Sequence, residues 1–221
     1  FYISSSGCLS AGRIRPELAL FPYRSDDYIH ENAENTGSKT LVRITTEAGL
    51  SYWEPFNTQH DHRYKVVRNL YKNATGNKLI FEELNQDLGL AFQYEWSTSD
   101  RFGFVRTSKF RALTSPTDCG TAPLQVELLD GLQNMLPAGT PAHLNNLSAL
   151  CDAYKWNEQI GPNGLTSFSM YAQLSDRAEP AESLRCTSAY YLGETPKAVL
   201  VSSEQIRQFR QGGAIQNEAL K

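Results

Sequence analysis

The stretch Leu88-Gly-Leu-Ala-Phe-Gln-Tyr-Glu-Trp-Ser97 decides the fold class of this chain. Its large apolar residues stand at every second position, and small or polar residues stand between them. Because successive side chains of a strand point to opposite sides, this period of two predicts a strand with one apolar face and one polar or groove-facing face. Ser99-Asp100-Arg101 predicts a turn and residues 102–106 predict a return strand, so the region is expected to form a β-hairpin. The predicted buried stripe consists of Leu88, Leu90, Phe92, Tyr94 and Trp96.

Similar short segments along the rest of the chain predict an all-β fold. Further strands are expected at residues 2–6, 40–46, 50–54, 64–71, 78–84, 109–113, 124–129, 165–174, 185–192 and 197–201. With the hairpin, this number of short strands predicts a sandwich of two large sheets. We expect one β-sandwich domain over residues 1–202.

Two segments have the pattern of short helices. Within residues 147–158 the apolar side chains fall on one helical face, and within residues 203–213 a serine-rich start and a Gly-Gly stop enclose a small apolar stripe. The tail from Ala214 to Lys221 has no evident partner in the sequence. We therefore interpret residues 203–221 as a helix and linker that lead toward a following domain.

Composition and charge exclude several classes of partner. The 221 residues carry a net charge of -3, from 21 basic and 24 acidic side chains, and no run of basic residues could neutralise a track of phosphates. No apolar stretch approaches the roughly 18 residues of a membrane span. We expect neither nucleic acid nor a membrane as partner. The 4 cysteines lack metal-type or scaffold-type spacing, so free thiols are expected, and a cytoplasmic location is favoured over a periplasmic one.

Catalytic and metal-binding motifs are weak in this chain. A glycine-rich phosphate loop, a nucleophile elbow and a zinc-protease motif are all missing from the sequence. His60-Asp61-His62 could hold an ion if it were a strand, because His60 and His62 would then point the same way, but a solvated hairpin end is the favoured interpretation. We expect no metal, no cofactor and no catalytic residue in this chain.

The longest stretch without a strand pattern, residues 10–38, is the main candidate for function. Loops of this length in a compact domain are commonly functional, and this one gathers arginines, carboxylates and aromatic rings. One interpretation is an ionic lattice that orders the loop. The other is a sugar site, in which Arg and Asp bind hydroxyl groups and an aromatic ring stacks on a pyranose. The candidate substrate-binding residues are Arg13, Arg15, Tyr23, Asp26, Asp27 and Trp53.

Two segments carry a resemblance to a known family. Ser10-Ala-Gly-Arg-Ile-Arg-Pro-Glu-Leu-Ala-Leu-Phe-Pro-Tyr-Arg-Ser-Asp-Asp27 and Glu127-Leu-Leu-Asp-Gly-Leu-Gln-Asn-Met-Leu-Pro137 resemble the N-terminal part of large bacterial proteins related to cellobiose-type glycoside phosphorylases. The resemblance spans most of the chain, although the loop at 10–38 matches no motif of the characterised phosphorylases. It implies a β-supersandwich, similar to galactose mutarotase, that precedes an (α/α)6 barrel carrying the general acid.

Two functions remain open on this basis. The first is an accessory domain that packs on a C-terminal catalytic barrel and contributes to oligosaccharide binding or to homodimer contacts, in a parent that acts on glycosides by phosphorolysis or hydrolysis. The alternative is a free-standing carbohydrate-binding or mutarotase-like sandwich. A mutarotase needs a Glu base and a His acid at one sugar, and no such pair stands out in the sequence.

Overall fold

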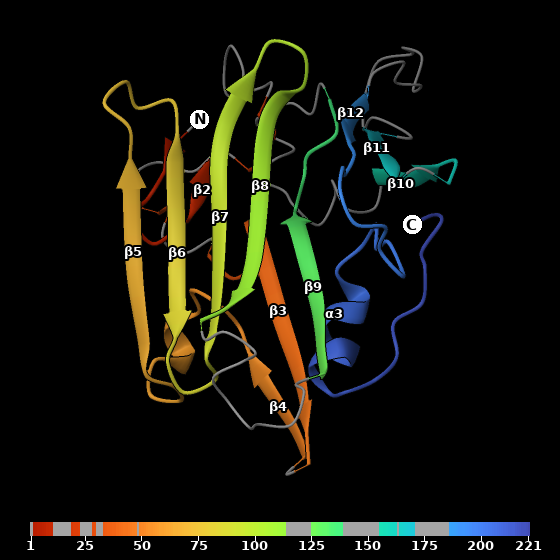
Figure 1. Ribbon diagram of the computed structural model, residues 1–221. Coiled ribbons are helices and arrows are strands. Elements are labelled where there is room, and N and C mark those ends of the chain that lie inside the picture. Colours follow the sequence, from red (N-terminus) through yellow and green to blue (C-terminus); the bar gives the residue numbers. More distant parts are fainter. Residues whose placement is uncertain are drawn as a thin grey trace, which may run out of the picture. The chain divides into compact units, whose positions relative to one another are not determined.

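Strands dominate the computed structural model, which confirms the all-β expectation (Figure 1). The structure describes residues 2–10, 19–22, 28–29, 33–47, 49–113, 125–138, 155–162, 164–170 and 186–221. Its strands are β1 (Tyr2–Ile3), β2 (Leu9–Ser10), β3 (Gly37–Thr46), β4 (Gly49–Trp53), β5 (Val66–Lys72), β6 (Leu79–Asn85), β7 (Leu90–Ser99), β8 (Gly103–Ala112), β9 (Gln125–Gln133), β10 (Lys155–Ile160), β11 (Leu165–Met170) and β12 (Cys186–Ala189). The described helices are the 3₁₀ turn η3 (Thr58–His60) and the α-helix α3 (Glu204–Arg210).

The described strands form four sheets instead of the two large ones expected. These are β1-β2, β4-β3-β9, β5-β6-β7-β8 and β10-β11-β12. The neighbours in β1-β2, β3-β4, β5-β6-β7-β8 and β10-β11-β12 pair antiparallel. The chain divides into two compact units, one of residues 40–129 and the other of residues 1–39 and 130–221. The predicted extent of one sandwich domain over residues 1–202 stays a prediction.

The first unit, residues 40–129, contains the hairpin that the sequence predicted. β7 and β8 pair from Leu90↔Ala112 to Ser99↔Gly103, so the return strand expected at 102–106 and the further strand expected at 109–113 are one continuous strand. In the turn between them, the Ser99 hydroxyl accepts hydrogen bonds from the backbone N–H groups of Arg101 and Phe102. The predicted stripe is confirmed for the buried side chains Leu90, Phe92, Tyr94 and Trp96.

Leu88 is the exception in that stripe. It lies in the turn before β7 and is half-buried. The turn is fixed by Asn85, whose side-chain oxygen accepts a hydrogen bond from the Leu88 N–H at 3.0 Å. The alternation therefore begins at the strand and not in the turn that precedes it.

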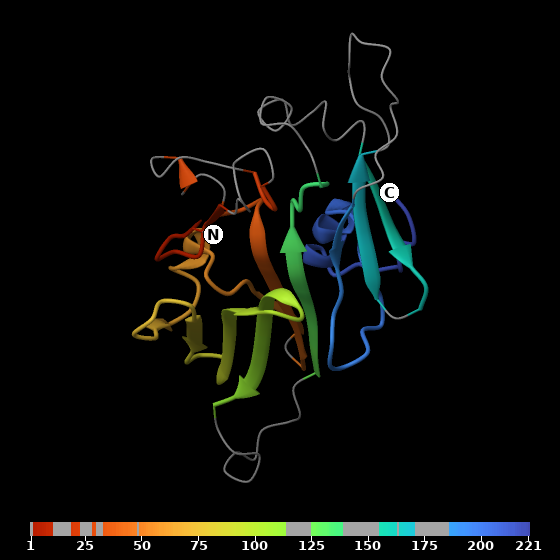
Figure 2. The same ribbon diagram turned by 90° about the horizontal axis from the view of Figure 1, so that it is seen from above.

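Strands β3 and β4 pack on the apolar face of β5-β8. Leu41, Val42 and Ile44 of β3 are fully buried. The ring of Trp53 in β4 lies 6.5 Å from that of Phe110 in β8, measured between centroids. Seen from above, the orange strand β3 lies on one side of the four-stranded sheet, whose strands are yellow to green (Figures 1 and 2). The centre of one face of the four-stranded sheet, with Phe81, Phe92 and Tyr94, is thus a buried core.

The second unit corrects the prediction of a helix at 147–158. Residues 155–160 form strand β10, which pairs with β11 from Lys155↔Met170 to Ile160↔Leu165; residues 147–154 lie outside the described part. The other edge of β10 pairs with the end of the chain, where Asn157 and Lys221 exchange two backbone hydrogen bonds of 2.8 Å. Backbone hydrogen bonds on both edges of β10 outweigh the local helical pattern, because helix propensity is weak compared with strand pairing in the folded chain.

The helix expected near residue 203 is confirmed as α3. Its first N–H group, that of Glu204, donates a hydrogen bond to the Ser202 hydroxyl at 3.3 Å. The strand expected at 197–201 is wrong: this stretch is irregular, and its backbone N–H groups bond to the side chains of Asn217 and Glu218. The expectation that residues 214–221 lack a partner is therefore also wrong. Whether another domain follows stays a prediction.

Near the N-terminus, the strand expected at 2–6 is limited to the short β1. Gly37 begins β3 with a φ of 87°, and a Cβ placed there would come within 2.9 Å of the Leu9 side chain. Phe21 is fully buried, and the Leu20 carbonyl accepts a hydrogen bond from the N–H of Leu136 at 2.9 Å. Of the cysteines, Cys8 is a buried free thiol and Cys186 an exposed one.

Within the described residues, no helix is both long and apolar enough to cross a membrane.

Candidate functional site

Strand β6 carries two adjacent glutamates on opposite faces of its sheet. Glu83 pairs across with Phe92 of the buried stripe, whereas Glu82 pairs across with Gln93. The side chain of Glu83 is 2% exposed and that of Glu82 is 12% exposed. Each glutamate is the centre of a polar network, and the two networks differ in their access to solvent.

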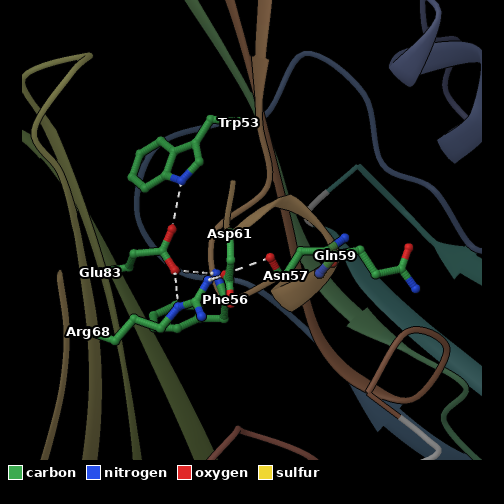
Figure 3. Close-up of polar contacts among 7 residues, drawn as sticks. All are labelled: Trp53, Phe56, Asn57, Gln59, Asp61, Arg68 and Glu83. Carbon is green, nitrogen blue, oxygen red and sulfur yellow. Dashed lines mark hydrogen bonds and ion pairs between the residues drawn. The ribbon is translucent and has the colours of Figure 1, made fainter. Parts of the chain in front are cut away.

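Glu83 joins the segment after β4 to the core of the sheet (Figure 3). One carboxylate oxygen accepts a hydrogen bond from the indole N–H of Trp53 at 2.8 Å. The other accepts from the backbone N–H of Phe56 at 2.8 Å and from Nε of Arg68 at 2.6 Å. Arg68 in turn donates to Asp61 at 2.6 Å. A buried carboxylate needs such donors because an isolated one would be very costly to desolvate.

The electrostatics of Arg68 agree with a structural role for this network. Burial, the largest single influence, would lower its pKa, but the hydrogen bonds and charges of Asp61 and Glu83 together outweigh burial and raise the pKa of Arg68 above its ordinary value. The guanidinium therefore stays charged and holds β5 to the turn that contains Asn57 and η3. Glu83 itself, 1% exposed, is closed to a substrate, although Arg68 and Asp61 at the edge of the network reach solvent.

The same geometry corrects the candidate role of Trp53. Its side chain is 2% exposed and its N–H is used by Glu83, so the ring cannot stack on a sugar in solvent. Phe56 shows how the local chain is held: its φ is 65°, in the left-handed region, and its ring centroid lies 5.2 Å from that of Tyr94. Trp53 is a core residue at the end of β4.

The other predicted substrate-binding residues lie outside the described residues. They are Arg13, Arg15, Tyr23, Asp26 and Asp27. Their role as a sugar site or as an ionic lattice stays a prediction.

His60-Asp61-His62 is not a strand, so its two imidazoles do not share a face by alternation. His60 ends η3, and Asp61 is used by Arg68. In the part of the chain that the structure describes, no group of three or more His, Cys, Asp or Glu side chains could hold a metal ion.

The face of β5-β8 that carries Glu82 is the better candidate, and we call it the outer face. The register aligns Asn69, Glu82, Gln93 and Lys109 in one row across the four strands. With strands about 4.8 Å apart, the row spans about 14 Å. Tyr71 and Arg111 flank this row on β5 and β8, and the six residues together are the Glu82 cluster. The members of the cluster are Asn69, Tyr71, Glu82, Gln93, Lys109 and Arg111.

Glu82 orients its neighbours by accepting three hydrogen bonds. Asn69 donates at 3.0 Å and the Tyr71 hydroxyl at 3.2 Å, both to one oxygen, and Arg111 donates to the other oxygen at 3.2 Å. The bond from Asn69, the largest influence, acts with those from Tyr71 and Arg111 against burial and lowers the pKa of Glu82 below its usual range. The hydrogen bond between Tyr71 and Glu82 also raises the pKa of Tyr71.

The cluster keeps binding groups available to solvent. Tyr71 is 50% exposed and the Arg111 side chain 54% exposed. Gln93 is half-buried and Lys109 is exposed, and neither side chain makes a hydrogen bond or ion pair with any residue of the described ranges. An aromatic ring, an amide and two cations therefore face solvent from a rigid sheet.

The chemistry of the outer face suits binding and not acid–base catalysis. Glu82 is held ionised, whereas a general acid needs a raised pKa. Glu95, on the same face, forms an ion pair with Lys78 at 2.8 Å. Neither carboxylate is arranged to deliver a proton.

The sequence contained only part of the signal for this site. Alternation in residues 88–97 placed Gln93 on the polar face, and residues 64–71 and 78–84 were expected to be strands. Nothing local says that Asn69, Glu82 and Lys109 share one row, because that depends on the register of three strand pairs.

The chain matches no protein-family model, and the comparison with curated proteins gives no match either.

Proposed function

We propose that this chain is an accessory carbohydrate-binding β-sandwich domain of a larger protein that acts on glycosides, and that the Glu82 cluster is its sugar-binding surface. The observation that carries the proposal is the exposed ring of Tyr71 beside a row of amide, carboxylate and ammonium groups on one sheet face. Sugars present apolar ring faces and many hydroxyl groups, so they suit a flat aromatic platform bordered by planar polar side chains.

Preorganisation supports this proposal. Asn69, Tyr71 and Arg111 are held by Glu82, so their side chains lose little conformational freedom when a ligand binds. Strands position side chains more rigidly than loops do. A weakly hydrophobic ligand such as a sugar gains most from a surface that is already ordered.

The finer architecture is also a proposal. The resemblance of residues 10–27 and 127–137 to glycoside phosphorylases supports a supersandwich similar to galactose mutarotase, followed by an (α/α)6 catalytic barrel. In that arrangement the loop at 10–38 would complete the substrate cleft or a dimer contact. The parent would perform phosphorolysis or hydrolysis, and this chain alone would not.

A free-standing carbohydrate-binding sandwich is the second candidate. Residues 219–221 pair with β10, so they belong to the folded unit and not to an unpaired linker. The Glu82 cluster would serve both candidates in the same way, so binding to sugars is tested first.

The test is a glycan array probed with the chain of residues 1–221, followed by calorimetry on the ligands found. Tyr71→Ala is expected to weaken binding at least tenfold by removing the platform. Tyr2→Ala is the matched control, because Tyr2 is 59% exposed and belongs to the other compact unit. Failure of the chain to bind any glycan, or equal binding by the two variants, would refute the proposed surface.

A further inference from the structure

The Glu82 cluster contains one cation without a counter-charge. In the row of Glu82 and the two rows beside it, Glu82 is paired with Arg111 and Glu95 is paired with Lys78. Among the described residues, Lys109 has no such partner. The two carboxylates are thus neutralised, and one positive charge remains on the outer face.

The free donors gather around Lys109. Gln93 lies directly opposite Lys109 in the register of β7 and β8. The Gln93 side chain also has no hydrogen-bond partner in the described part. Directly opposed residues have Cβ atoms about 5 Å apart. Arg111 lies two residues along β8 on the same face, a rise of about 7 Å. Arg111 uses one terminal nitrogen for Glu82 and has other N–H groups to offer.

We infer that the outer face selects glycans that carry a carboxylate, with the acid group of a uronic acid residue bound by Lys109, Gln93 and Arg111. This inference rests on the proposed function and names its ligand class. The sugar ring that bears the acid, or the ring next to it, would lie over Tyr71.

Charge complementarity favours a singly charged ligand. One unpaired ammonium balances one carboxylate, whereas a phosphate dianion would add a second negative charge on a face that already holds Glu82 and Glu95. A planar carboxylate also matches the planar fork of a guanidinium, which can donate two parallel hydrogen bonds. The single uncompensated cation is too little charge for a polyphosphate backbone.

The experiment compares oligogalacturonate with its methyl ester, which has the same sugar rings without the charge. Calorimetry uses the chain of residues 1–221 and the variants Lys109→Gln, Lys197→Gln and Tyr71→Ala. Lys197→Gln is the matched control, because Lys197 is an exposed lysine of the other compact unit. The chain without substitutions is expected to bind the acid at least tenfold more tightly than the ester. Its affinity for the acid is expected to fall as salt is added.

Lys109→Gln should bring the two ligands to equal affinity, and Lys197→Gln should leave the preference unchanged. If both forms bind equally and Lys109→Gln alters neither, while Tyr71→Ala weakens both, the inference is overturned and the proposed function stands. Tighter binding of a sulfated glycan than of the acid also overturns it. Absence of binding to these and to all arrayed glycans overturns the proposed function itself.

Discussion

Glu82 and Glu83 are neighbours with the same carboxylate and the same number of hydrogen-bond donors, yet the two faces of β6 give them different roles. Glu83 receives its donors from Trp53, Phe56 and Arg68, and Glu82 receives its donors from Asn69, Tyr71 and Arg111. The difference lies in the exposure of the aromatic partners, 2% for Trp53 and 50% for Tyr71. A list of hydrogen bonds therefore does not separate a structural network from a binding surface, and access to water does.

The largest contrast between the faces should appear on β7, where Phe92 points inward and Gln93 outward. Phe92 is fully buried and its ring lies 6.3 Å from those of Phe56 and Tyr94. Phe92→Ala should lower the free energy of unfolding by about 3–5 kcal/mol, from lost apolar burial and the cavity left behind. Gln93→Ala should change it by less than about 0.5 kcal/mol. Urea denaturation checks both, and an unchanged midpoint for Phe92→Ala would contradict the buried stripe.

A smaller but still clear effect is expected for Glu83→Gln. The amide keeps one acceptor for Trp53 but turns its NH₂ group toward Phe56 N–H and Arg68, which are also donors. Leaving buried donors unsatisfied costs about 2–3 kcal/mol in total. The measurement is the denaturation midpoint, with Trp fluorescence to show whether the indole environment changes. A variant as stable as the unsubstituted chain would mean that the Glu83 network positions side chains without adding to the free energy of unfolding.

Glu82→Gln should have little effect on stability, about 0.5–1 kcal/mol or less, because the Arg111 side chain that pairs with it is 54% exposed. Its effect on ligand binding should be larger, since the amide cannot hold Asn69, Tyr71 and Arg111 together. Parallel denaturation and glycan titration of the variant separate these two quantities. Loss of stability comparable to that of Glu83→Gln would show that the two faces are not as different as proposed.

The smallest expected effect is a pH dependence that belongs to Glu82. Its folded-state pKa lies below the usual value of 4.5, so the ionised form adds stability above that value. This contribution is lost as the pH falls from 4.5 through the lowered pKa. The difference in midpoint between the parent chain and Glu82→Gln should therefore be constant from pH 5 to pH 7 and shrink in more acidic buffer, as about one proton is taken up. A difference that grows on acidification would have the wrong sign for this interpretation.

Local patterns predicted the hairpin β7-β8 well because its two strands are adjacent in sequence and its core face is strongly apolar. They failed at β10. Residues 155–160 have polar side chains on both faces, and their hydrogen-bond partners include Lys221, far along the chain. Strand pairing of that kind depends on chain closure over long distances and has no local signature.

The candidate site was harder to predict than the fold. Its members come from four strands, and only the register places Lys109 beside Gln93. Trp53 shows the converse problem: an aromatic residue near polar neighbours suits a sugar platform in the sequence, but in the structure the same residue is buried at a strand end and bonded to Glu83. Exposure is a property of the packed sheet, so residue type alone cannot supply it.

The uneven burial of the three tryptophans gives this protein a built-in optical probe. Trp53 and Trp96, at 2% and 5% exposure, belong to the unit of residues 40–129, and Trp156, at 38% exposure, belongs to the other unit. A water-soluble quencher such as acrylamide should reach Trp156 first and leave an emission from the shielded pair. Fluorescence recorded with and without quencher can then follow the two units separately during unfolding, with no label added to the chain.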